Sequence, residues 1–232
     1  LWGVRMEYSH LKKKELNPAQ ILAAGFAGII FLGTILLNLP IATISLESAG
    51  LVNAFFTATS SVCVTGLVVV DTGTYWSTFR KVIILLLIQV GGLGFMSMAT
   101  LGAFIVGRKI TLRNRLIMQE AFNQFTISGI VRLVRYILMI TLLIEGIGAV
   151  LLSVYFIPIY GKARGILYGI FHSVSAFCNA GFDLIGNGQS FMPFVESGYL
   201  SFVIIALIFV GGPGFSVLLD VAKTRRFRKL TL

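Results

Sequence analysis

Charged residues are scarce in this sequence. Lys, Arg, Asp and Glu together make up only 12% of the 232 residues, whereas 56% are hydrophobic and the mean hydropathy is +0.91. Water-soluble globular domains do not normally combine so little charge with so many apolar residues. The composition therefore excludes an ordinary soluble domain and predicts an integral membrane protein.

Residue types that carry enzyme chemistry are also rare. The chain contains nine acidic residues, two histidines and two cysteines, and neither H-E-x-x-H nor G-x-S-x-G occurs. Asp71 and Asp220 are expected near opposite membrane faces, so they cannot act as a carboxylate pair. His172 alone is no metal site and is expected to be a buried hydrogen-bonding residue. The sequence thus argues against an enzyme and predicts no cofactor, while Cys63 and Cys178 are expected to be small buried side chains without a disulfide.

Four long apolar stretches approach the roughly 20 residues that cross a hydrocarbon core about 30 Å thick. They cover residues 21–37, 82–106, 137–157 and 200–219. Glu145 is the one charged residue inside them, and it would cost about 2.5 to 3.5 kcal/mol if unpaired. Two roles stay open for it: a structural hydrogen bond within the bundle, which we favour, and a place on an ion pathway.

Basic residues are distributed unevenly around these stretches. Of the 19, only Arg80, Lys81, Lys162 and Arg164 fall in the two connections on one side of the membrane. The others lie before the first stretch, between the second and third, and after the fourth. The positive-inside rule then places both termini and the central loop in the cytoplasm. Such a distribution predicts contact with membrane lipid rather than with nucleic acid.

The sequence repeats itself. Three segments recur in the same order: residues 60–67 (SSVCVTGL) as 175–182 (SAFCNAGF), 90–95 (VGGLGF) as 210–215 (VGGPGF), and 108–112 (RKITL) as 228–232 (RKLTL). Each copy is expected to contain a spanning helix, a short apolar segment that enters and leaves the membrane on the outer side, and a second spanning helix. Since both copies run in the same direction, an axis along the membrane normal relates them, and such an axis can surround a pore.

The short apolar segments cover residues 51–70 and 166–182 and change character along their length. Residues 51–61 favour a helix of about three turns, whereas residues 62–66 are rich in β-branched side chains and end in glycine, which favours an extended strand. A half-helix entering from outside places its negative C-terminal end near the bilayer midplane, and a strand behind it presents carbonyls that suit alkali cations. The glycine motifs at 91–94 and 211–214 fit close helix packing, a water-filled cavity, or both.

On these motifs the chain resembles the Ktr/Trk and plant HKT superfamily of potassium transporters, specifically the pore-forming membrane subunit of a bacterial Ktr system. Residues 57–67, 70–72, 89–95 and 177–182 carry the resemblance. It implies an all-α membrane protein with two parallel repeats, each made of a helix, a re-entrant pore helix plus filter strand, and a helix. The implied function is potassium uptake across the bacterial cytoplasmic membrane, with Na⁺ coupling left open. The implied filter residues, whose backbone carbonyls would bind K⁺, are Val64, Thr65, Gly66, Leu67, Asn179, Ala180, Gly181 and Phe182.

The resemblance also implies partners. Members of the superfamily have four repeats in one chain, so the two repeats here are expected to combine with a C-terminal half or with a second copy. A full-length subunit is expected to form a homodimer and to bind a cytoplasmic nucleotide-binding regulatory subunit. The amphipathic segment 116–125 would contact either that subunit or the membrane surface. The alternative is a truncated half-subunit that does not conduct and acts only in assembly.

The expected organisation has five parts. They are a cytoplasmic N-terminal tail (1–18), a first pore repeat (19–107), a cytoplasmic amphipathic linker (108–135), a second pore repeat (136–222) and a basic cytoplasmic end (223–232). Asp71 and Glu47 are expected to flank the outer mouth, where they either concentrate cations or are ordinary solvated loop charges.

The charge distribution predicts the membrane topology. Cysteines introduced at Thr74 and Gly188 should react with a membrane-impermeant thiol reagent added outside intact cells, whereas a cysteine at Asn114 should react only after the membrane is opened. Labelling of Asn114→Cys from outside would overturn this topology.

Overall fold

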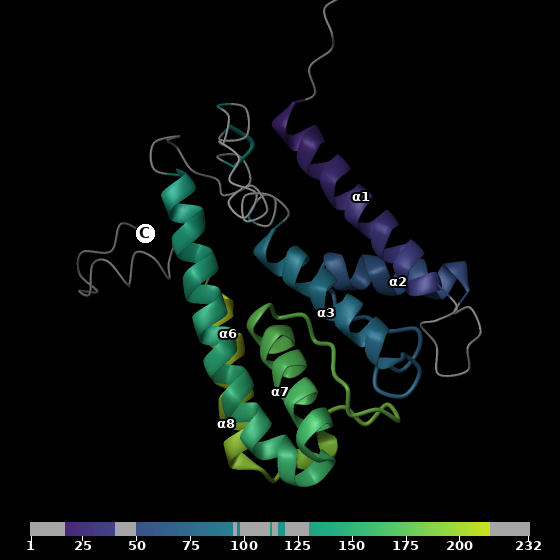
Figure 1. Cartoon of the computed structure of the whole chain (residues 1–232), viewed down its shortest axis with the longest axis vertical. Helices are drawn as coiled ribbons and strands as arrows, with labels where there is room; N and C mark the ends of the chain where they lie inside the picture. The colour runs from purple at the N-terminus through teal and green to yellow at the C-terminus, as the bar shows by residue number, and fades with distance from the viewer. Residues whose placement is uncertain are drawn as a thin grey trace, which may run out of the picture.

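The computed structural model describes residues 17–39, 50–94, 97, 112, 116–118 and 130–213. Every element within these ranges is a helix, which confirms the all-α prediction (Figure 1). In chain order they are α1 (Pro18–Asn38), α2 (Leu51–Val62), α3 (Thr78–Leu93), α6 (Ile130–Tyr160), α7 (Lys162–Phe177), the 3-10 turn η2 (Met192–Phe194) and α8 (Gly198–Gly211). Nearly all of the predicted tail, most of the predicted linker, the basic end and Glu47 lie outside the described residues.

The helices form two groups of the same design. In the first group the short helix α2 packs against α1 and α3, and in the second the short helix α7 packs against α6 and α8. Figure 1 shows α1, α2 and α3 together on one side and α6, α7 and α8 on the other. The groups contact each other through α3 and α7. The sequence repeat is therefore also a structural repeat.

Each inner helix, α3 or α8, begins at a serine. The Ser77 hydroxyl accepts a hydrogen bond from the backbone N–H of Arg80, and the Ser197 hydroxyl accepts one from the backbone N–H of Leu200. A serine at this position satisfies one of the free N–H groups of the first helical turn. α7 begins at Lys162, four residues earlier than the apolar pattern predicts, because the helix continues through Arg164 up to the turn at Gly161.

The inner helices end at their glycine motifs. The prediction of one continuous helix over residues 82–106 is wrong, because α3 stops at Leu93 and Gly94 has a φ of 79°. α8 ends at Gly211, just before Pro213, which cannot donate a helical hydrogen bond. Two of the helices, α1 over Ala19–Asn38 and α6 over Val134–Tyr160, are long and apolar enough to cross a membrane.

The glycine motifs allow the inner helices to approach the short helices. A Cβ built on Gly91 would collide with the carbonyl oxygen of Val62, the last residue of α2. A Cβ on Gly211 would collide in the same way with the carbonyl oxygen of Phe177, the last residue of α7. Small residues at helix contacts are the usual means of close packing in lipid. The packing interpretation of these glycines is thus confirmed at equivalent places in both repeats.

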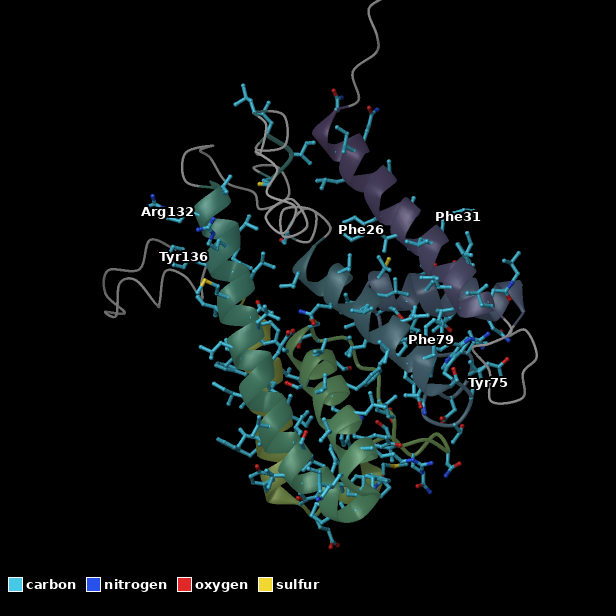
Figure 2. All side chains as sticks on the ribbon, in the orientation of Figure 1. Phe26, Phe31, Tyr75, Phe79, Arg132 and Tyr136 are labelled. Atoms are coloured by element: carbon cyan, nitrogen blue, oxygen red, sulfur yellow. The ribbon has the colours of Figure 1, made fainter. Side chains whose placement is uncertain are left out.

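The surface of the bundle is apolar, as a lipid-facing surface must be. Phe31 is 69% exposed and projects from α1 away from the other helices, whereas Phe26 lies on the opposite flank of α1 and packs against the core (Figure 2). Phe202 and Phe209 on α8 are 73% and 76% exposed. In water such a surface would be an aggregation hazard, but in a bilayer it is the expected outer face.

The main core joins the two repeats. It combines side chains of α2 and α3, including Ala58, Ile84 and Ile88, with Phe171 of α7 and Phe182 behind it. The segments that follow the short helices are consequently held at the contact between repeats, where the predicted functional residues lie.

Candidate functional site

Equivalent non-helical segments follow α2 and α7. Val64 and Gly66 have φ values of 56° and 72°, and Asn179 and Gly181 have values of 57° and 72°. A positive φ is uncommon outside glycine and is a genuine outlier for a β-branched residue such as Val64. The backbone therefore differs from the regular extended strand that the sequence predicts, since alternate residues are left-handed. The two repeats share this strained geometry residue by residue.

A serine in each short helix holds this geometry. The Ser60 hydroxyl donates a hydrogen bond to the carbonyl of Leu67 (2.7 Å), and the Ser175 hydroxyl donates one to the carbonyl of Phe182 (2.6 Å). The carbonyls of the same serines accept bonds from the backbone N–H groups of Thr65 (3.0 Å) and Ala180 (2.7 Å). Each segment is thus folded back onto the last turn of its own short helix.

The two segments meet at their glycines. A Cβ on Gly66 would lie 2.5 Å from the carbonyl oxygen of Ala180 and 3.3 Å from the Cα of Gly181. Glycine is therefore required at position 66 for two reasons, namely the left-handed φ and the close approach of Ala180 and Gly181. A Cβ on Gly181 would meet only the Cα of Gly66 at 3.6 Å, so at Gly181 the φ of 72° is the main constraint.

The predicted site residues differ in burial. Gly66, Ala180 and Gly181 come together at the contact, and Phe182 is buried in the core, whereas Leu67 is 61% exposed. One side of the second segment is not covered by other side chains and borders a cavity of about 270 Å³. Its lining includes His172, Ser175, Asn179, Gly181, Asp183 and Ile208.

His172 fixes the backbone beyond the second segment. Its Nδ1 lies 2.8 Å from the carbonyl oxygen of Tyr168, and its Nε2 accepts a hydrogen bond from the backbone N–H of Leu184 (3.0 Å). Because a carbonyl faces Nδ1 and an N–H faces Nε2, the ring must be neutral with its proton on Nδ1. The sequence prediction of a buried hydrogen-bonding histidine is confirmed. Its partner Leu184 could not be predicted, because the bond closes a loop rather than a helical turn.

Glu145 faces protein. It is 5% exposed, and the Gln89 side-chain amide donates to both carboxylate oxygens at 3.1 and 3.0 Å. The favoured prediction, a hydrogen bond within the bundle, is confirmed. Gln89 lies on α3 of the first repeat, so the pair also links the two repeats.

The cysteines do not occupy equivalent surroundings. Cys178 packs on α3 at Gly92, where a Cβ would lie 2.5 Å from its sulfur, whereas Cys63 is exposed. The prediction that both are buried is thus wrong for Cys63. Cys178 is covered by α3, the inner helix of the first repeat, whereas among the described residues no inner helix packs on Cys63 in this way. We call the contact between Gly92 and Cys178 the glycine–cysteine joint.

Asp71 ties the loop between α2 and α3 to the loop between α7 and α8. Its carboxylate accepts hydrogen bonds from the backbone and hydroxyl of Thr74 and from the backbone N–H of Gly188 in the second repeat. Partial burial acts to raise the pKa of Asp71, but these bonds outweigh it and hold the pKa below its ordinary value. Asp71 is therefore a structural link rather than a freely solvated charge.

Comparison with known proteins points to one family. The TrkH family, described as cation transport proteins, matches residues 13–232. Potassium/sodium uptake protein NtpJ of Enterococcus hirae is 46% identical over 220 residues, which are 95% of this chain and 48% of that protein. Ktr system potassium uptake protein B of Bacillus subtilis is 44% identical over 222 residues, 96% of this chain and 49% of that protein. The protein of the same name from Vibrio alginolyticus is 38% identical over 217 residues, 94% of this chain and 46% of that protein. The chain spans about half the length of these relatives.

The hydrogen bonds of Asp71 predict a pH-dependent contact between the two loops. Because the pKa of Asp71 is lowered, the link is complete above about pH 4 and is lost as the pH falls through the lower folded-state pKa. Asp71→Asn should speed amide hydrogen exchange of the peptide around Gly188 at pH 7, after correction for intrinsic rates. This difference from the wild type should shrink below about pH 4. An equal difference at every pH would contradict the assignment.

Proposed function

Because this chain belongs to the TrkH family of cation transport proteins, we propose that it supplies half of a potassium-selective pathway through the cell membrane. The observation that carries the proposal is the pair of matched segments after α2 and α7, which share their left-handed residues and meet at Gly66 and Gly181. The names of the relatives support potassium as the cation, since all three are potassium or potassium/sodium uptake proteins. The family consists of transport proteins, not enzymes.

In this proposal the ion ligands are backbone carbonyls. α2 and α7 direct their negative C-terminal ends toward the segments, which favours a cation there. A regular strand points successive carbonyls to opposite faces, and left-handed residues at alternate positions turn them toward one side. Carbonyls so aligned replace the water shell of a dehydrated alkali cation. The carbonyls of Leu67 and Phe182 already accept from serine hydroxyls, so we assign them to the outer edge of the filter.

Two segments do not complete a filter. The known solution for potassium uses a ring of four, and unsatisfied backbone facing lipid would cost several kcal/mol per group. The exposed Cys63, the exposed Gly212 and the uncovered side of the second segment support two missing neighbours. We propose that a C-terminal half or a second copy fills them. The same proposal includes cytoplasmic termini, a homodimer of the full-length subunit and a cytoplasmic regulatory partner at the linker, the last supported by relatives named as proteins of a Ktr system.

A non-conducting half-subunit is the second candidate. It is favoured by one observation, the exposure of Cys63, whose counterpart Cys178 is covered by Gly92 of the neighbouring repeat. Potassium flux into liposomes that contain the chain alone, compared with the chain joined to the remaining half of the Bacillus subtilis relative, separates the two functions.

The filter assignment predicts the effect of a substitution at Gly66. In the joined protein, expressed in bacteria without their own potassium uptake, Gly66→Ser should lower the preference for K⁺ over Na⁺ about tenfold. The reason is that a Cβ at position 66 would collide with the carbonyl oxygen of Ala180 and displace the converging carbonyls. A loss of about 1.4 kcal/mol in the free-energy difference between the two ions is a factor of ten. Gly28→Ser is the matched control, since a Cβ there meets nothing within 4 Å. Unchanged selectivity in Gly66→Ser would mean that Gly66 is only a turn residue.

The glycine–cysteine joint predicts how copies of the isolated chain associate. If a second copy supplies the missing repeats, Cys63 of one copy lies at Gly212 of the other. Mild oxidation of Gly212→Cys should then yield disulfide-linked dimers in the membrane, and Cys63→Ser should abolish them. Selective potassium flux should accompany the dimer alone. A monomer that conducts K⁺ selectively would refute the requirement for four segments.

A further inference from the structure

A buried polar group lies directly behind the second filter segment, at the boundary between repeats. Its centre is the carboxylate of Glu145, midway along α6, whose other charged residues, Arg132 and Arg135, lie near its N-terminal end. Besides Gln89, its Oε1 lies 3.8 Å from the sulfur of Cys178, which donates a weak hydrogen bond. A carboxylate at this depth is expensive to insert into a membrane. The contacts of the Glu145 carboxylate therefore indicate its role.

Three elements converge on Glu145. Gln89 belongs to α3, Cys178 follows α7 directly, and Ser173 within α7 donates from its hydroxyl to the backbone carbonyl of Glu145 at 2.7 Å. Cys178 is also the residue immediately before Asn179, which carries the first left-handed φ of the segment. A shift of the Glu145 side chain would consequently reach the filter backbone through a single residue.

We propose that Glu145 is a positioning residue for the second filter segment. This positioning role rests on the function proposed above. One oxygen accepts from Gln89 and Cys178 together while the other accepts from Gln89, so the carboxylate holds the start of the segment at a set distance from the inner helix of the first repeat. Gly92 completes the arrangement, because its lack of a side chain admits the sulfur of Cys178. An alanine or leucine at position 145 could fill space but could accept neither bond.

The alternative role for Glu145 is helix packing alone. Packing would affect how much protein folds, whereas positioning would affect which ion passes. The two roles therefore differ in their measurable consequences, and a thermodynamic cycle between Glu145 and Cys178 separates them.

The test uses the chain joined to the remaining half of the Bacillus subtilis relative. Glu145→Ala, Glu145→Gln, Cys178→Ala and the double variant Glu145→Ala/Cys178→Ala are compared for protein in the membrane, K⁺/Na⁺ preference and KM for K⁺. Glu145→Gln has the same shape and removes the buried charge, so it should insert at least as readily as the wild type. We expect both Glu145 variants to lower the K⁺/Na⁺ preference, with Glu145→Ala lowering it about threefold to tenfold.

The cycle gives the decisive result. If Glu145 acts through Cys178, the double variant should lose no more selectivity than the worse single variant. The matched control is Cys63→Ala in place of Cys178→Ala, because Cys63 holds the equivalent position in the first repeat, whereas the carboxylate of Glu145 bonds to Gln89 and Cys178. The effect of Cys63→Ala should add to that of Glu145→Ala. The proposal would be overturned if the selectivity losses of Glu145→Ala and Cys178→Ala added up in the double variant. It would also be overturned if the Glu145 variants kept the normal K⁺/Na⁺ preference.

Failure of this inference is distinguishable from failure of the proposed function. Gly66→Ser in the same joined protein tests the filter without Glu145. If Gly66→Ser lowers selectivity and the Glu145 variants do not, only the positioning role is wrong. If neither change affects selectivity, the filter assignment itself is wrong.

Discussion

Non-helical backbone inside a membrane must find its hydrogen-bond partners within the protein, because lipid offers none. In the proposed pore the segments after α2 and α7 lie at that depth, and a small number of side chains supply their partners. Ser60 and Ser175 fold each segment back onto its helix, and His172 accepts from the backbone N–H of Leu184. Each of these side chains projects from a short helix. The short helices thus supply both the approach to the segments and the bonds that keep them folded.

Packing in lipid imposes a second condition, since apolar side chains gain nothing from leaving an apolar solvent. Close contact between backbones takes the place of the hydrophobic effect. Gly91 and Gly211 seat the inner helices on the last carbonyls of α2 and α7, and Gly92 admits Cys178 across the boundary between repeats. A buried polar contact is also made at the end of α1. There the buried guanidinium of Arg80 donates a hydrogen bond to the carbonyl of Leu39 at 2.8 Å.

Much of this architecture could be predicted from the sequence, because helices, membrane spans and repeats have local signatures. The bounds of α2, the glycine packing and the existence of a hydrogen bond within the bundle for Glu145 could be predicted in this way, whereas the identity of its partner Gln89 could not. The break at Gly94, the left-handed Val64 and Asn179, and the exposure of Cys63 could not be predicted either. β-Branched composition favours an extended strand at Val64, and the hydrogen bonds from the last turn of the preceding short helix override that preference. The exposure of Cys63 depends on which helices pack around it, and its local sequence does not show this. The functional roles of the eight filter residues stay predictions, and so do the cytoplasmic termini.

The two sides of the glycine–cysteine joint are different surfaces. One side is the inner helix of one repeat, and the other is the end of the short helix of the next repeat. Such a heterologous contact cannot pair two repeats face to face; it can only add further units with the same rotation until a ring closes or a chain continues. The handedness of the repeats around their common axis is therefore already decided by which helix carries Gly92 and which carries Cys178, before any ion or further subunit is present.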